Sequence, residues 1–300
     1  MNKSISAIIL TFNEELHIER CIRELHGVVD DIYIVDSGST DNTVSLAEGL
    51  GAKVYYNKWI NYSSQLNWGI NNLPINTQWV LRIDCDEYLT NELKNELSLK
   101  LPNISEDING IYIKRRVIFM GKWIKHGGYY PFNMLRIWRR NKAYCEQQWM
   151  DEHMKLYEGK SLNFKNDFYD SNLNNLTWWT EKHNNYSLRE MFDLLNLKYG
   201  FSEYDNVKPK ILGSQEERKR WLKYRFSKTP LFIRPFVYFI YRYFFKLGFL
   251  DGKEGLIWHF LQGFWYRFLV DSKIFELHYK VGKNKEDLKK SLEKEYKIKF

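Results

Sequence analysis

Three short apolar runs early in the chain each end in a polar cluster, and this pattern constrains the fold most. The runs, each with the cluster after it, are Ile5–Leu10 before TFNEE (11–15), Ile32–Val35 before DSGSTDNT (36–43), and Trp79–Ile83 before DCDE (84–87). Stretches with helical periodicity lie between them, and strands alternating with helices predict a parallel sheet covered by helices. Because ligands of such sheets bind beyond the carboxyl ends of the strands, we expect the three clusters to meet at one edge.

The acidic triplet Asp84-Cys85-Asp86, with Glu87 behind it, follows the third apolar run. Two carboxylates spaced two residues apart at a strand end can share a hard divalent cation, which in enzymes commonly holds phosphate oxygens. Solvated turn residues are the alternative interpretation. Strand alternation should turn Cys85 to the opposite face, and a thiolate is a poor ligand for Mg²⁺ or Mn²⁺. The triplet therefore predicts a metal site on Asp84 and Asp86 and a nucleotide-linked substrate.

Asp36 is the strongest nucleotide-site candidate of the first half of the chain. It ends an apolar run that we expect to be a buried strand, and it has no obvious capping role. We therefore expect its carboxylate to accept hydrogen bonds from a base or a ribose. Helix capping is the alternative explanation for the neighbouring polar residues, which are Asn13, Glu14, Ser39, Thr40 and Asp41. Gly38 is then needed only for the turn.

Three motifs in order, TFNEE (11–15), VDSGSTDNT (35–43) and DCDE (84–87), resemble the signature of the inverting family 2 glycosyltransferases. The resemblance continues through FMGKWIKHGGYYP (119–131) and LRIWRR (135–140), a stretch similar to the branch that builds lipopolysaccharide core and capsule sugars in bacteria. It covers roughly residues 4 to 160. The resemblance implies a GT-A fold, in which a mostly parallel α/β sheet is flanked by helices.

The resemblance also implies a domain plan and a set of site residues. A catalytic domain would span 1–207, with a nucleotide-binding half at about 1–100 and an acceptor-binding half at about 101–207. Metal binding is implied for Asp86 and Asp84. Many relatives have Asp-Asp-Gly-Ser where this chain has Asp36-Ser37-Gly38-Ser39, so the choice of nucleotide stays open. The implied nucleotide-binding residues are Thr11, Asn13, Glu14, Asp36, Ser37 and Asp84.

A base must accept the proton of the acceptor hydroxyl. The segment Met150–His153 stands where relatives carry a Val-His-Glu type motif whose glutamate is the base. Alignment with that motif makes Glu152 the predicted base, with Asp151 as the alternative. His153 is then a third metal ligand or a supporting group, and an ordinary surface turn is the remaining interpretation.

Other polar residues are weaker candidates. Gln65 and Asn67 lie in a helical stretch after Trp59, where family members often place polar residues near the diphosphate, although amides on a helix commonly face solvent. We expect one or two arginines of the second half to meet phosphates and the others to form a solvated face. These arginines are Arg115, Arg116, Arg136, Arg139 and Arg140.

The region 208–300 differs in character, being basic and aromatic. From 208 to 246 the chain has eleven Lys or Arg residues against Glu216 and Glu217. Charges interrupt every apolar run that would be long enough to span a bilayer. Aromatic helices with intervening cations fit the surface of an anionic membrane, on which we expect Arg234, Arg242 and Lys246 to meet lipid. Packing on the catalytic core or on a second subunit is the alternative.

Nucleic acid is an improbable partner, because apolar stretches such as Pro235–Tyr241 have no use on a phosphate backbone. The first strand is expected at Ile5, which leaves no room for a signal peptide, and Cys21, Cys85 and Cys145 form no disulfide or zinc pattern. We therefore expect a cytoplasmic protein that is peripheral on the inner face of the cell membrane.

These observations predict a metal-dependent inverting enzyme that moves a sugar from a nucleotide-diphosphate-sugar donor to a lipid-linked saccharide acceptor. A sugar-phosphate nucleotidyltransferase is one alternative, but it needs a glycine-rich basic loop, and Ile5–Glu15 contains neither glycine nor a basic residue. A non-catalytic, membrane-docked scaffold with a transferase fold is the other alternative. The presence of Asp84, Asp86 and Glu152 argues against it.

Overall fold

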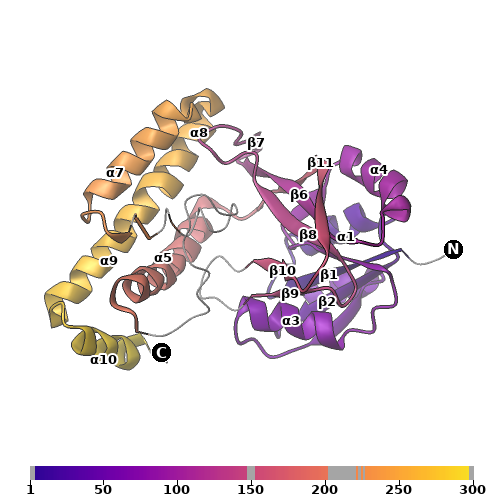
Figure 1. Cartoon of the computed structure of the whole chain (residues 1–300), viewed down its shortest axis with the longest axis horizontal. Helices are drawn as coiled ribbons and strands as arrows, with labels where there is room; N and C mark the ends of the chain where they lie inside the picture. The colour runs from indigo at the N-terminus through magenta and orange to yellow at the C-terminus, as the bar shows by residue number, and fades with distance from the viewer. Residues whose placement is uncertain (1–3, 147–152, 202–220, 222–223, 226, 297–300) are drawn as a thin grey trace. The chain divides into compact units, whose positions relative to one another are not determined.

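The computed structural model describes residues 4–146, 153–201, 221, 224–225 and 227–296 (Figure 1). The chain forms two compact units, Met1–Asn174 and Asn175–Phe300. The division precedes helix α5 (Leu176–Tyr199), whereas the sequence predicted a boundary near 207. The reason is that α5 packs on α9 (Tyr266–Val281), a helix of the second unit, where the Nζ atom of Lys273 lies 2.9 Å from the Oδ1 atom of Asn184.

One mixed sheet forms the frame of the first unit. Among the residues that the structure describes it has nine strands, in the order β3-β2-β1-β4-β8-β6-β11-β5, with β7 paired to β6. The first four strands of that order run parallel, as predicted, and β8 joins β4 in the antiparallel direction. The strands of the sheet are β1 (Ile5–Thr11), β2 (Asp31–Asp36), β3 (Lys53–Tyr56), β4 (Trp79–Arg82), β5 (Glu87–Leu89), β6 (Ile108–Phe119), β7 (Lys122–Trp123), β8 (Asn133–Arg139) and β11 (Lys160–Asp170).

Helices cover both faces of this sheet because its central strands are apolar on both sides. In β1, Ile5, Ala7 and Ile9 belong to one hydrophobic core and Ile8 to the other, which is the two-residue alternation of a strand. Helix α1 buries four residues at intervals of three and four, the period of an amphipathic helix. The helices of this unit are α1 (Ile18–Leu25), α2 (Thr43–Gly49), α3 (Tyr62–Asn72), α4 (Asn91–Lys100) and the short η1 (Leu101–Asn103). A separate small sheet pairs β9 (Ala143–Cys145) with β10 (Met154–Leu156).

The second unit is helical over its described residues, as the sequence predicted for most of this region. None of the helices that the structure describes is both long and apolar enough to cross a membrane. Besides α5 and α9 the unit contains α7 (Ile233–Ile240), η2 (Tyr241–Phe245), η3 (Gly248–Asp251), α8 (Gly252–Trp258), η4 (His259–Trp265) and α10 (Lys285–Tyr296).

The prediction that Arg234 meets lipid is wrong. Its side chain is only 4% exposed, and its Nε donates to the Oδ1 of Asp271 at 2.8 Å. Asp271 also accepts a hydrogen bond from the backbone N–H of Phe232 at 2.8 Å, so the start of α7 is anchored to α9. A buried guanidinium needs such a carboxylate partner, and this need decides which face of α7 turns inward.

Candidate active site

The predicted meeting of the polar clusters at one sheet edge is confirmed. Thr11 pairs with Asp36 in the parallel register of β1 and β2, and Ile8 pairs with Arg82 of β4 on the other side of β1. The N–H of Ser37 donates to the carbonyl of Thr11 at 3.0 Å, which joins the first two clusters directly. Cys85, in the third cluster, is buried. Its Sγ lies 3.7 Å from the carbonyl oxygen of Leu10, at the end of β1.

Asp36 stabilises the loop that follows β2. Its Oδ1 accepts hydrogen bonds from the hydroxyls of Thr11 (2.8 Å) and Ser39 (2.5 Å), and its Oδ2 accepts from the N–H groups of Gly38 and Ser39, both at 2.8 Å. Burial alone would raise the pKa of Asp36, but the four donors hold this pKa below its ordinary value. The expectation that Asp36 caps nothing is therefore wrong, because it caps a turn in which Gly38 has a φ of +98°. Its contact with a nucleoside stays a prediction.

We expect Asp36→Asn to lower the free energy of unfolding by about 1–3 kcal/mol at neutral pH, because the new amide N–H₂ would face existing donors. A carboxylate whose pKa is lowered in the folded state stabilises the fold above its ordinary pKa of 3.8 and loses that contribution as the pH falls through the folded-state value. The difference between wild type and variant should thus be full at neutral pH and shrink below about pH 4. Urea unfolding at several pH values measures it, and an equal difference at every pH would contradict the assignment.

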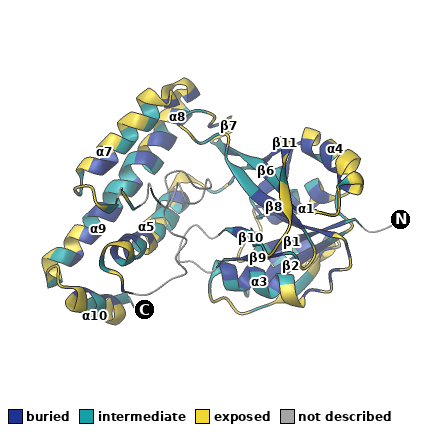
Figure 2. Cartoon of the chain, viewed as in Figure 1, coloured by how far each residue is buried: buried dark blue, intermediate teal, exposed yellow. Residues whose placement is uncertain are grey.

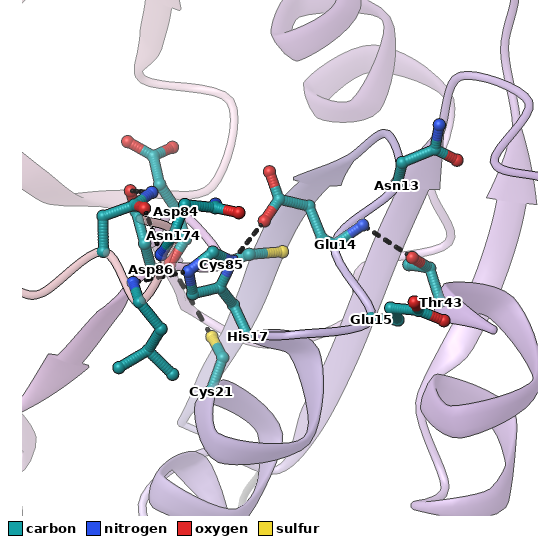
Figure 3. A network of polar contacts seen from close by, with 12 residues as sticks. Asn13, Glu14, Glu15, His17, Cys21, Thr43, Asp84, Cys85, Asp86 and Asn174 are labelled. Atoms are coloured by element: carbon teal, nitrogen blue, oxygen red, sulfur yellow. Dashed lines mark hydrogen bonds and ion pairs between the residues drawn. The ribbon is translucent and has the colours of Figure 1, made fainter. Parts of the chain in front are cut away.

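Glu14 is fixed at both ends (Figure 3). Its N–H donates to the Oγ1 of Thr43 at 2.7 Å, and its Oε2 lies 2.7 Å from the Nδ1 of His17. The Nε2 of His17, a side chain only 1% exposed, accepts the N–H of Leu173 at 2.9 Å. His17 therefore connects the loop after β1 to the segment after β11, a role that nothing in the sequence pattern around it indicated.

Asn13 does not cap a helix, contrary to the alternative weighed from the sequence. Helix α1 begins only at Ile18, and Asn13 has a φ of +55° in the loop before it. Its Oδ1 accepts the N–H of Thr40 at 2.8 Å, and its own N–H donates to the Oγ of Ser39 at 2.9 Å. Asn13 thus holds the loops after β1 and β2 together.

Asp84 lies just beyond β4 with its side chain 32% exposed. Its Oδ1 accepts the hydroxyl of Tyr62 at 2.8 Å, and its Oδ2 lies 3.4 Å from the Nη2 of Arg82 and 3.5 Å from the Nη1 of Arg136. Burial would raise the pKa of Asp84, but the two guanidiniums and the Tyr62 hydroxyl hold it well below its ordinary value. Asp84 is therefore ionised at neutral pH.

Asp86 is held by the segment that follows β11. Its Oδ2 accepts the Nδ2–H of Asn172 at 2.9 Å, and its carbonyl accepts the N–H of Ser171 at 2.9 Å. Asp170, the residue before Ser171, has a partly exposed side chain, and its Oδ2 lies 3.3 Å from the Nη1 of Arg115. Burial, together with the charges of Asp86 and Asp84, raises the pKa of Asp170 to about 6 against the opposing effect of Arg115. Asp170 thus lies within electrostatic range of Asp84 and Asp86, at the edge where the acidic triplet stands.

Sequence reasoning missed Asp170 and Asn172, although a signal was present. An acidic residue that ends a strand and is followed by Ser occurs at Asp36-Ser37 and again at Asp170-Ser171. In the sheet, Asp170 pairs with Glu87 of β5, which places the end of β11 next to the acidic triplet.

Glu87 and Arg136 form a buried ion pair below the site, each with its side chain almost fully buried. A nitrogen of the guanidinium donates to the Oε1 of Glu87, while the Oε2 of Glu87 accepts the N–H of Asp84 at 2.9 Å. The expectation of a solvated arginine face is therefore wrong for Arg136. Its guanidinium lies 4.8 Å from the ring centroid of Phe168, in the core.

The donor atoms at this edge fit a hard divalent cation. The Asp84 and Asp86 carboxylates are the type of ligand that Mg²⁺ and Mn²⁺ prefer, and these ions take further oxygens from phosphate groups of a substrate. The Nδ1 of His153 lies 3.0 Å from the Oε1 of Glu146, and a place for His153 as a third ligand stays a prediction. Within the described ranges, no three His, Cys, Asp or Glu side chains are grouped so that they could hold a metal. The structure therefore gives no support to His153 as the third ligand.

Two further groups of predicted residues have different outcomes. Asp151 and Glu152, the candidate bases, lie outside the described residues.

Gln65 is fully buried, with its Nε2 donating to the Oγ of Ser37 and to the carbonyl of Asn57, both at 3.0 Å. Asn67 exchanges two hydrogen bonds of 2.8 Å with the backbone of Cys145. These contacts favour a supporting role for Gln65 and Asn67 over direct contact with a diphosphate.

Residues 6–165, just over half of the chain, match the glycosyl transferase family 2. An uncharacterized glycosyltransferase of Rickettsia conorii is 38% identical over 137 residues, which cover 44% of this chain and 48% of that protein. The chain thus spans about half the length of the first Rickettsia relatives that it matches. The lipopolysaccharide core biosynthesis glycosyltransferase LpsC of Rhizobium meliloti is 29% identical over 284 residues, 91% of this chain and 93% of LpsC.

Among solved structures, glucosyl-3-phosphoglycerate synthase from Mycobacterium tuberculosis, in complex with Mn²⁺ and uridine diphosphate, is 25% identical and covers 38% of this chain and 44% of its own. The TM-score is 0.32, which is too low for this likeness to indicate a function. The family match carries the assignment instead. It begins in β1 and ends within β11, so it spans the strands whose ends bear the polar clusters and agrees with a GT-A architecture. The chain therefore belongs to glycosyl transferase family 2.

Proposed function

We propose that this protein transfers a sugar, with inversion, from a nucleotide-diphosphate-sugar donor to a lipid-linked saccharide acceptor of the lipopolysaccharide-core or capsule type. The observation that supports this most is the convergence of three polar loops at one sheet edge around Asp84 and Asp86. The similarity to LpsC along nearly the whole chain supports the acceptor class. The match to family 2 disfavours the nucleotidyltransferase alternative.

The loops after β1 and β2 are proposed to bind the nucleoside. They are already connected through Asp36, Asn13 and Glu14, so little conformational entropy is lost when the donor binds. The polar groups that we expect to face the nucleoside are those of Thr11, Asn13, Glu14, Ser37 and Asp36. Gln65 holds the Ser37 hydroxyl in place.

Asp84 and Asp86 are proposed to hold Mn²⁺ or Mg²⁺. When bound, the ion would neutralise the negative charge that develops on the departing nucleoside diphosphate. Neighbouring side chains hold both carboxylates in a state that suits a metal ligand. Arg82 and Arg136 keep Asp84 ionised, and Asn172 orients Asp86 through its Oδ2.

Glu152 is proposed as the base, with Asp151 as the alternative. The carboxylate takes the proton of the acceptor hydroxyl as its oxygen forms a bond to the anomeric carbon, and the bond from that carbon to the diphosphate oxygen breaks on the opposite face. A single displacement of this kind inverts the anomeric configuration. The acceptor is held by a lipid anchor, so we also propose an anionic membrane surface as a partner and peripheral association with it.

We expect one nucleotide-diphosphate sugar to raise the melting temperature of the protein by about 5 °C or more when Mn²⁺ or Mg²⁺ is present, because a ligand that binds only the native state stabilises it. A panel of donors is measured by thermal unfolding with each metal and with a chelator. Matching nucleoside monophosphates serve as controls, since they lack the diphosphate that the ion would hold. If no donor stabilises the protein with any metal, the transferase proposal fails.

A further inference from the structure

The continuous helix formed by α7 and η2 exposes its apolar side. Large apolar side chains recur along it at intervals of three and four residues, which places them on one helix face. Each is between 45% and 60% exposed, whereas the exposed side of a helix in water is normally polar. These side chains belong to Ile233, Phe236, Val237, Ile240, Tyr241 and Phe244.

The buried side of this helix is fixed by an ion pair. Arg234, on that side, is paired with Asp271 of α9, which is 1% exposed. Rotation of the helix to bury its apolar side would expose or break this pair, and an unpaired buried carboxylate at Asp271 would be costly. The outward orientation of the apolar side is thus imposed by the fold of the second unit.

Six more large apolar side chains are exposed between the end of η2 and the start of η4. They are between 44% and 74% exposed and belong to Phe245, Leu247, Phe249, Leu250, Leu256 and Phe260. Helices α7 and η4 are packed together by aromatic rings, with the Phe236 and Phe264 centroids 4.5 Å apart. Exposed segments run along both α7 and α8 (Figure 2). We call the six residues on α7–η2 the apolar face; the second group follows it along the chain.

Positive charge accompanies the apolar face. Arg225, Lys228, Lys246 and Lys253 are exposed near its two ends in the sequence. In the continuous described stretch 227–260, the acidic residues are Glu254, which is half-buried, and the buried Asp251. A second copy of this surface would bring like charges together, whereas anionic lipid headgroups complement them. The combination of exposed aromatic and aliphatic side chains with flanking cations is typical of helices that lie in a membrane interface.

We propose that the apolar face docks onto an anionic lipid bilayer, with Phe236, Ile240 and Phe244 entering the boundary between headgroups and acyl chains. This inference deepens the membrane partner of the proposed function and rests on it. It also changes the expected source of binding. The sequence assigned docking to aromatic rings together with cations such as Arg234, Arg242 and Lys246. Arg234 is buried, so burial of apolar side chains is expected to supply most of the affinity.

The test is flotation of the full chain with vesicles of phosphatidylcholine, with and without phosphatidylglycerol. Wild type should float with the anionic vesicles, and the variant Phe236→Ser/Ile240→Ser/Phe244→Ser should partition at least about 100-fold more weakly. The control, Leu99→Ser/Leu197→Ser/Tyr279→Ser, removes exposed apolar side chains outside the apolar face and should float like wild type. The control should unfold close to the wild-type temperature, because its three positions are exposed. The Phe236 variant also loses the contact of Phe236 with Phe264, so its thermal unfolding is measured without lipid, and flotation is compared at a temperature at which it is folded.

Three results would overturn the inference: no flotation of wild type, equal flotation of wild type and the Phe236 variant, or a lipid-free dimer that the Phe236 variant converts to a monomer. The last result would mean that a second copy covers the apolar face. Donor-dependent thermal protection is measured on the same proteins and should be equal in all of them. A protein that floats but gains no protection from any donor would refute the proposed transfer reaction and leave the docking surface standing.

Discussion

Asp86→Asn is expected to lower kcat for sugar transfer by about 10³-fold while the fold remains stable. The amide keeps the size of the side chain and one oxygen, but it loses the negative charge that a divalent cation needs. Asp86 is only partly buried, and one hydrogen bond to its side chain is found, from Asn172, so the substitution leaves the packing intact. Initial rates measured across a range of Mn²⁺ concentrations, together with thermal unfolding without metal, separate the chemical effect from a folding effect.

The matched control is Asp107→Asn, which removes an exposed carboxylate that pairs with Lys160 on the surface. It should leave turnover and the Mn²⁺ requirement unchanged, because exposed ion pairs contribute little. Wild-type turnover by the Asp86→Asn enzyme would eliminate the metal role of this carboxylate. An equal loss in both variants would point to an unspecific effect of net charge.

Arg136→Met is expected to lower the free energy of unfolding by about 3–5 kcal/mol, because it leaves Glu87 buried without its cationic partner. Both side chains of this pair are about 2–3% exposed. Burial and the nearby Asp84 and Asp170 already raise the pKa of Glu87, and Arg136 opposes them. Without Arg136 the Glu87 carboxyl should take up a proton more readily, so the loss of stability should be smaller at acidic pH. Urea unfolding measures this.

Two comparisons make this prediction specific. The double variant Arg136→Met/Glu87→Met replaces the whole pair by apolar side chains and should recover much of the lost stability. Lys53→Met breaks a pair with Asp31 in which the lysine is 49% exposed, and it should cost less than about 1 kcal/mol. If Arg136→Met is no more destabilising than Lys53→Met, the pair does not support the site as inferred.

Much of the first unit follows from the sequence. The strands at Ile5–Thr11, Asp31–Asp36 and Trp79–Arg82 were predicted within one or two residues, because two-residue and helical periodicities are local properties. The meeting of their polar ends at one edge was also predictable, since parallel strands joined by helices share the edge at which they end.

The use of individual polar side chains could not be predicted in this way. Whether Asp36 faces a ligand or the protein depends on Thr11, which is 25 residues away, and the state of Arg136 depends on Glu87 at a separation of 49. From the sequence, Gln65 and Asn67 were expected to be amides on a helix surface. In the structure Gln65 bonds to Ser37 in the loop after β2, and Asn67 bonds to Cys145 in β9. Their partners come from other elements, so no local pattern could reveal them.

The sequence by itself determined the first strands and helices of the first unit and the edge at which the acidic loops meet, because the periodicity of apolar residues fixes which face of each element is buried. The tertiary structure alone decided that Asp170 joins the acidic triplet through the pairing of β11 with β5. It alone also decided that Arg234 turns inward while Phe236 and its neighbours turn outward. The physical reason is that a buried charge must find a partner of opposite sign, and that partner lies on an element distant in the chain.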